Sequence, residues 1–171
     1  MTPTLASEEI RLDVRGIILD PTSQVPIVIL RAEGEGLLLP IWIGIHEANS
    51  IAAALEGIEP PRPQTHDLTK SLLEAAGAHV VKVVISDLRE STFFAVLHIH
   101  TPEGLRTLDA RPSDAIALAT RFKAPVYALQ EVLLRAIDED KAVASEDMTD
   151  EERLRRFLEQ VRPEDLGKYT M

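Results

Sequence analysis

The chain has 171 residues, of which 45% are hydrophobic and 27% charged, and its formal net charge is −10. This composition suits one domain with an appendage, and its core must be aliphatic because aromatic residues make up only 4% of the chain. The absence of cysteine excludes disulfides, thiolate metal sites and a cysteine nucleophile. No secretory signal is visible, and no apolar run approaches the roughly 20 residues of a membrane helix. We therefore expect a cytoplasmic protein that makes no membrane contact.

The acidic excess is concentrated at the C-terminal end. Residues 138–171 hold 11 acidic and 6 basic side chains, and this net charge of −5 is half of the total excess. Thr149 and Glu152 match a capping box, and the helix behind it offers an apolar face of Leu154, Phe157, Leu158 and Val161. We predict an α+β domain over residues 8–138, followed by an acidic linker and C-terminal helical tail over residues 139–171.

Strands and helices alternate irregularly in the first domain. Alternating or continuous apolar runs predict strands over residues 10–15, 26–30, 37–43, 80–85, 93–100, 105–109 and 125–128. Helical spacing predicts helices that begin near residues 46 and 65 and cover residues 112–122 and 131–137.

Two details refine this arrangement. In the second helix we expect Leu68 and Leu72 to face inward, and Pro40 favours an edge position or a bulge for the third strand. Hairpins mixed with helices indicate an α+β fold. We predict a mixed, mostly antiparallel sheet packed with about three main helices, plus the C-terminal helical appendage.

A dense polar group stands where the strand over residues 105–109 should end and a helix should begin. Asp109, Arg111, Ser113 and Asp114 fall within six positions. Ser113 and Asp114 can satisfy free amides in the first helical turn and complement the helix dipole. Capping does not account for Asp109 and Arg111. We therefore give equal weight to a site role and a structural role for these two residues.

Other candidates are scattered along the chain. His66 and Asp67 open the second helix, where Asp67 has a capping explanation and His66 is a candidate proton carrier near neutral pH. Arg62 lies between prolines that restrict its backbone, and it could contact a phosphate or pair across a subunit interface. Arg89 follows Asp87 at a strand end, where an ordinary salt bridge is the simpler interpretation.

Several of these stretches together resemble the bifunctional nuclease domain family. They are residues 39–44, 47–48, 61–68, 87–89 and 109–115, which follow the family's order within residues 10–138. The resemblance implies an intracellular α+β domain that commonly forms dimers, with reported nuclease activity on both DNA and RNA. It supplies no established catalytic mechanism. Ser91 stands where relatives often carry glycine, a departure that touches only a hairpin.

Phosphodiester hydrolysis requires an activated water and stabilisation of charge on the phosphoryl oxygens. From the resemblance and the residue types, our first hypothesis is a nuclease that cleaves DNA and RNA with low sequence specificity, as a homodimer or higher homo-oligomer. Its catalytic residues would be Asp109, Asp114 and His66. Mg²⁺ or Mn²⁺ would be held by Asp109, Asp114 and Asp67, and phosphates would be bound by Arg111, Arg62 and Arg89. The alternative, which the net charge favours, is a non-enzymatic dimeric module that recognises a small anion or a protein partner.

Overall fold

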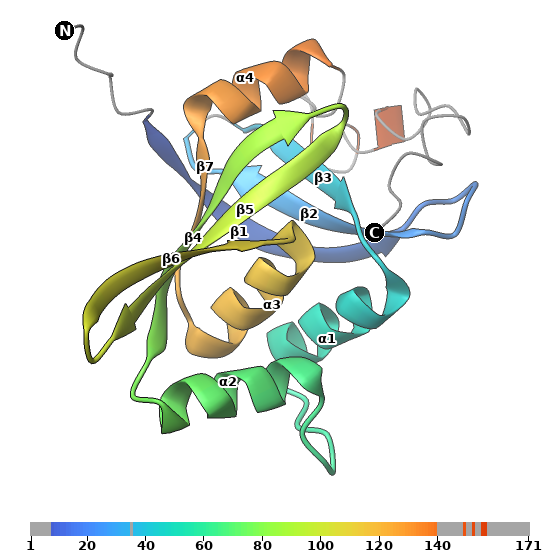
Figure 1. The fold of residues 1–171 in the computed structure, drawn as a ribbon. Coiled ribbons are helices and arrows are strands. Elements are labelled where there is room, and N and C mark those ends of the chain that lie inside the picture. The colour runs from blue at the N-terminus through green and yellow to red at the C-terminus, as the bar shows by residue number, and fades with distance from the viewer. Residues whose placement is uncertain (1–7, 35, 140–148, 150–151, 153–154, 157–171) are drawn as a thin grey trace, which may run out of the picture.

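The computed structural model describes residues 8–34, 36–139, 149, 152 and 155–156. These residues form a seven-stranded sheet with the strand order β3-β2-β1-β7-β4-β5-β6 (Figure 1). The strands are β1 Glu9–Leu19, β2 Pro26–Ala32, β3 Leu38–Trp42, β4 His79–Arg89, β5 Thr92–Thr101, β6 Gly104–Ala110 and β7 Val126–Leu129. The helices are α1 Ile45–Glu56, α2 Thr65–Ala75, α3 Pro112–Phe122 and α4 Gln130–Asp138. Every strand pair is antiparallel except β4 with β7, so the predicted mixed α+β fold is confirmed.

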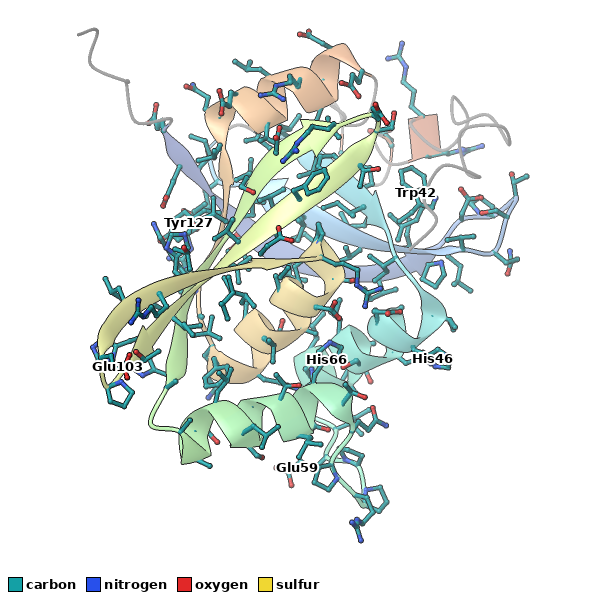
Figure 2. The ribbon with its side chains drawn as sticks, in the orientation of Figure 1. Trp42, His46, Glu59, His66, Glu103 and Tyr127 are labelled. Carbon is teal, nitrogen blue, oxygen red and sulfur yellow. The ribbon has the colours of Figure 1, made fainter. Side chains whose placement is uncertain are left out.

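The late strand β7 lies in the middle of the sheet. It pairs with β1 on one side and with β4 on the other, and so joins the β1–β2–β3 hairpins to the β4–β5–β6 hairpins. Helix α3 connects β6 to β7 and packs on β4 and β5. Helices α1, α2 and α3 lie next to one another, and α4 is at the opposite end of the view in Figure 1. Figure 2 shows His66 among the three helices and Trp42 at the end of β3.

The most deeply buried helix is α3. Its residues from Ala115 to Ala119 are at most 5% exposed, and the alanines among them allow the helix backbone to approach the sheet closely. Pro112 occupies the first turn, where no amide donor is needed, and Lys123 ends the helix in a left-handed conformation with φ 54°. The predicted helix over residues 112–122 is confirmed at both ends.

Helix α2 corrects the sequence prediction, because none of its residues is buried. Leu68 is 53% exposed and Leu72 is 62% exposed, and only the neighbouring Leu73 packs against the core. The side of the helix that faces α3 is instead polar and carries His66 and Asp67. Helical spacing identified leucines that share a face, but that face points away from the core.

The structure also bears on the predictions for β3 and for the C-terminal tail. Among the described strands β3 is at one edge, as the internal Pro40 indicated. The Thr149 amide donates to Glu152 Oε2 at 2.9 Å and the Glu152 amide donates to Thr149 Oγ1 at 3.3 Å, which confirms the capping box. The predicted apolar face of the tail helix lies outside the described residues. No helix in the described ranges is long and apolar enough to cross a membrane.

The exposure of α2 can be tested with two matched substitutions. Leu118 of α3 is 5% exposed, so Leu118→Ala should lower the free energy of unfolding by about 2–5 kcal/mol through lost burial and a residual cavity. Leu72→Ala should change it by less than about 0.5 kcal/mol. Urea unfolding followed by circular dichroism measures both, and comparable losses in the two variants would show that Leu72 is covered in solution.

Candidate functional site

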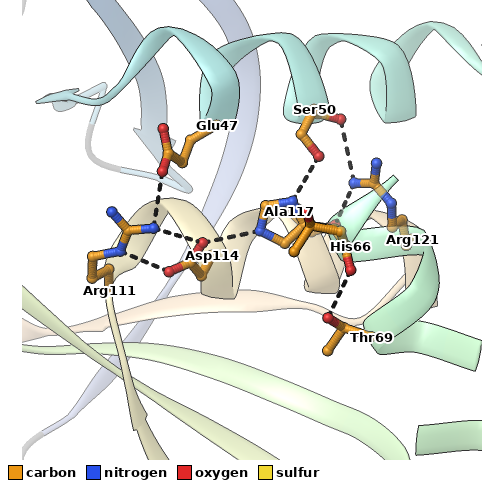
Figure 3. A network of polar contacts seen from close by, with 9 residues as sticks. Glu47, Ser50, His66, Thr69, Arg111, Asp114, Ala117 and Arg121 are labelled. Carbon is orange, nitrogen blue, oxygen red and sulfur yellow. Dashed lines mark hydrogen bonds and ion pairs between the residues drawn. The ribbon is translucent and has the colours of Figure 1, made fainter. Parts of the chain in front are cut away.

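A chain of polar contacts joins α1, α2 and α3 (Figure 3). Helix α1 contributes one carboxylate and one hydroxyl, α2 contributes an imidazole and a carboxylate, and α3 with its N-cap contributes two guanidinium groups and a carboxylate. We call this set the helix network, and its members are Glu47, Ser50, His66, Asp67, Arg111, Asp114 and Arg121.

His66 lies at the centre of the helix network. Its Nδ1 is 2.8 Å from Ser50 Oγ, and its Nε2 is 3.0 Å from Asp114 Oδ1. With the proton on Nε2, the neutral ring donates to Asp114 and accepts from the Ser50 hydroxyl. This order of serine, histidine and carboxylate is that of an activated nucleophile. However, Ser50 is only 4% exposed, so its hydroxyl is closed to a polymeric substrate and the contact serves to position His66.

Arg111 and Asp114 form the exposed end of the helix network. Arg111 Nε donates to Asp114 Oδ2 at 2.8 Å, and Nη2 donates to Asp114 Oδ1 at 3.1 Å and to Glu47 Oε1 at 2.9 Å. The hydrogen bond from His66, followed by that from Arg111, lowers the pKa of Asp114 to about 2. Asp114 is therefore ionised at neutral pH, and it fixes the direction of a guanidinium that is 47% exposed.

The opposite end of the helix network is structural. Arg121 is only 8% exposed, and its Nε donates to Asp67 Oδ1 at 2.7 Å while Nη1 donates to the carbonyl oxygens of Ser50 and Ala117. Hydrogen bonding from Arg121 holds the pKa of Asp67 below its ordinary value. The second Asp67 oxygen accepts from the Gln64 amide at 2.9 Å, so the predicted capping role is confirmed. Asp67 thus attaches α2 to α3.

The remaining predicted site residues lie outside the helix network. Asp109 is exposed at the end of β6, and Arg62 is exposed in the connector between α1 and α2. Neither side chain forms a hydrogen bond or ion pair within the described part of the chain. Arg89 donates to Asp87 Oδ2 at 2.6 Å and lies 4.3 Å from the ring centre of Phe94, which confirms the salt-bridge interpretation.

Sequence reasoning missed Glu47, Ser50 and Arg121 as partners of these residues. Glu47 and Ser50 are three positions apart on one face of α1, and Arg121 follows Asp114 by two helical turns. These helical spacings are the sequence signals that could have identified the three residues. The prediction that Ser113 and Asp114 satisfy free amides is wrong, because neither side chain accepts from an amide in the described residues and Asp114 binds His66 and Arg111 instead. Asp114 does lie in the first turn of α3, where its charge complements the helix dipole as predicted.

The predicted metal ligands are not gathered into one site. Among the described residues, no three His, Cys, Asp or Glu side chains come together in a way that could hold a metal ion. The carboxylates of Asp67 and Asp114 each face an arginine, a cation that competes directly with a metal. This donor set does not fit the predicted ion, and we assign no reaction step to one. Mg²⁺ can also bind one or two carboxylates together with substrate phosphates, so dependence on Mg²⁺ or Mn²⁺ stays a prediction.

The pairing of Asp114 predicts a specific pH dependence of stability. Its pKa of about 2 lies below the ordinary value of 3.8, so the ionised carboxylate stabilises the fold above that ordinary value. The stabilisation is lost as the pH falls toward the folded-state pKa. Urea unfolding midpoints measured from about pH 5 to about pH 2 should therefore fall less steeply for Asp114→Asn than for the wild type.

The exposed Asp13 of β1 supplies the control for this experiment. In Asp13→Asn the urea midpoint should fall with pH as steeply as in the wild type, because Asp13 makes no ion pair with any described residue. A wild-type slope in Asp114→Asn would contradict the pairing of Asp114 in solution.

Comparison with known proteins identifies the family of this chain. The Bifunctional nuclease domain matches residues 28–140. The Uncharacterized protein Rv1829 of Mycobacterium tuberculosis is 38% identical over 158 residues, which are 89% of this chain and 94% of that protein. Bifunctional nuclease 1 of Oryza sativa subsp. indica is 34% identical over 58% of this chain and 31% of its own length. Bifunctional nuclease 2 of Arabidopsis thaliana is 30% identical over 67% of this chain and 37% of its own length.

The chain therefore matches only about a third of the length of these plant relatives, whereas it covers almost the whole mycobacterial protein. The matched region contains β3, α1 to α4 and the entire helix network. This chain belongs to the bifunctional nuclease domain family.

Proposed function

We propose that this chain is a nuclease that hydrolyses phosphodiester bonds of DNA and RNA with low sequence specificity. Membership of the family and the names of its plant relatives support this activity. Low specificity follows if the enzyme contacts phosphates, which are identical along every strand, and does not read base edges.

The observation that carries the proposal is the way in which the Arg111 guanidinium is hydrogen-bonded. Its Nε and Nη2 groups are held by Asp114 and Glu47, whereas Nη1 donates to no acceptor in the described residues. A guanidinium that is already oriented loses little conformational freedom when it binds a phosphate. The Nη1 group can therefore contact a phosphoryl oxygen without disturbing the ion pairs that position it.

His66 and Asp114 act on the phosphate through Arg111. Both ring nitrogens of His66 are engaged and its side chain is 12% exposed, so the geometry supports a positioning role. The predicted role of His66 as a proton carrier remains to be tested by the pH dependence of cleavage. A catalytic base should add an ionisation to the rate profile that His66→Gln removes, whereas a positioning residue should lower the rate at every pH.

The proposal predicts which substitutions abolish cleavage. Wild type should degrade end-labelled single-stranded RNA, single-stranded DNA and duplex DNA, and Arg111→Gln should reduce the rate by roughly a hundredfold through loss of the phosphate contact. Asp114→Asn should also be impaired because it releases Arg111. Arg106→Gln is the matched control, since Arg106 on β6 is 59% exposed and pairs only with Glu103 among the described residues.

Several outcomes of this assay are decisive. Equal rates for wild type and Arg111→Gln would refute the phosphate contact, and loss of activity in a folded Asp109→Asn would place Asp109 at the reacting phosphate. Cleavage that persists in EDTA would refute the predicted Mg²⁺ or Mn²⁺, whereas loss in EDTA with recovery on adding metal would support it. No cleavage of any substrate by folded wild type would favour the non-enzymatic binding module. Light scattering on the same preparation tests the proposed homo-oligomer.

A further inference from the structure

A pocket of about 520 Å³ opens beside the helix network, at the start of α1 and α3. This volume lies in the range of sites for small organic ligands. The end of β3 and the start of β5 complete its wall. Most of the lining is apolar and includes Ile41, Trp42, Ile43, Phe93 and Pro112.

The polar part of the pocket favours an anion. Arg111 is the one charged residue among the described lining residues, and no Asp or Glu is present there although the whole chain carries a net charge of −10. Gln24 and Thr92 add neutral hydrogen-bonding groups. The pocket therefore combines apolar walls with a single cationic corner.

Ser113 supplies a further polar group to the pocket. It lines the pocket, is only 6% exposed, and its hydroxyl has no hydrogen-bond partner among the described residues. The hydroxyl oxygen itself is not buried from solvent, so it is available to donate to a ligand in the pocket. Ser113 also belongs to the first turn of α3, where the amides have no side-chain cap and the helix dipole favours negative charge.

We propose that this pocket binds a single nucleotide unit, with the base against Trp42 and Phe93 and the phosphate on Ser113 and Arg111. A flat base fits between aromatic and aliphatic walls, and its polar edge can use Gln24 and Thr92. This inference rests on the proposed function, in which Arg111 contacts the phosphate, and it names single-stranded nucleic acid as the substrate class. A stacked and paired base cannot enter such a pocket without leaving the duplex.

The pocket contains its own spectroscopic probe. Trp42 is the only tryptophan of the chain, so intrinsic fluorescence reports on the pocket wall. Adenosine monophosphate or uridine monophosphate added to the full chain should produce a saturable fluorescence change, and titration calorimetry should give the same Kd. Adenosine or uridine alone should bind at least about tenfold more weakly, because the charge-assisted contacts are missing. Inorganic phosphate alone should leave the fluorescence unchanged.

Matched variants locate the binding site. Ser113→Ala and Arg111→Gln should each raise the Kd for the monophosphates about tenfold. The controls Ser71→Ala, on the exposed side of α2, and Arg106→Gln should retain the wild-type Kd. Ser113→Ala should also keep the wild-type melting temperature, since it removes a hydroxyl that has no partner among the described residues.

The pocket inference and the nuclease proposal fail in different ways. No saturable binding, equal binding of nucleoside and nucleotide, or an unchanged Kd in Ser113→Ala and Arg111→Gln would overturn the pocket inference. Cleavage of polymers without monophosphate binding would do the same and leave the nuclease standing. Monophosphate binding without any cleavage would support the pocket and refute the nuclease. Faster cleavage of single strands than of duplex DNA is expected, and the opposite preference would overturn the assigned substrate class.

Discussion

The arrangement of the three neighbouring helices depends on charges paired along one side of α3. Near the end of this helix, the almost fully buried Arg121 meets Asp67 of α2 at 2.7 Å. Near the start of α3, Asp114 contacts His66, which also belongs to α2. Removing Asp67 would leave the nearly buried guanidinium of Arg121 without its counter-charge. Because α2 has no buried residue, these polar contacts decide where it lies, and apolar packing contributes mainly through Leu73.

The same contacts connect the fold to the candidate site. His66 is held by Ser50, it holds Asp114, and Asp114 in turn directs Arg111 toward the pocket. The first contact joins α2 to α1 and the second joins α2 to α3, while Arg111 is the N-cap of α3 itself. The direction of one exposed guanidinium therefore depends on the packing of three helices. This arrangement also explains how a strongly acidic chain presents a cation to a ligand. The carboxylates orient the guanidinium on one side and leave the Nη1 edge available on the other.

Local features of the chain were predictable and distant partnerships were not. Pro112 and the alanine-rich run behind it defined α3 correctly, and Pro40 indicated an edge strand, because both rest on backbone geometry within a few residues. The inward orientation of Leu72 was wrong because periodicity shows which side chains share a face, and only packing decides which face is covered. Ser50 and His66 are 16 positions apart, and Asp67 and Arg121 are 54 apart, so no local pattern could pair them. Polar crowding around Arg111 did identify two members of the helix network, Arg111 and Asp114, but it could not separate Asp109 from Asp114.

The central position of β7 has a consequence for how the chain acquires its fold. The β1–β2–β3 and β4–β5–β6 groups consist of neighbouring hairpins that can form from local contacts. The strand that joins them is made last, and it pairs Ala128 with Ile10 at one side and with Ile85 at the other. During synthesis the two halves therefore expose unpaired strand edges until β7 leaves the ribosome. Pairings between such distant segments are slow to form, so closure of the sheet by β7 is expected to limit the rate of folding.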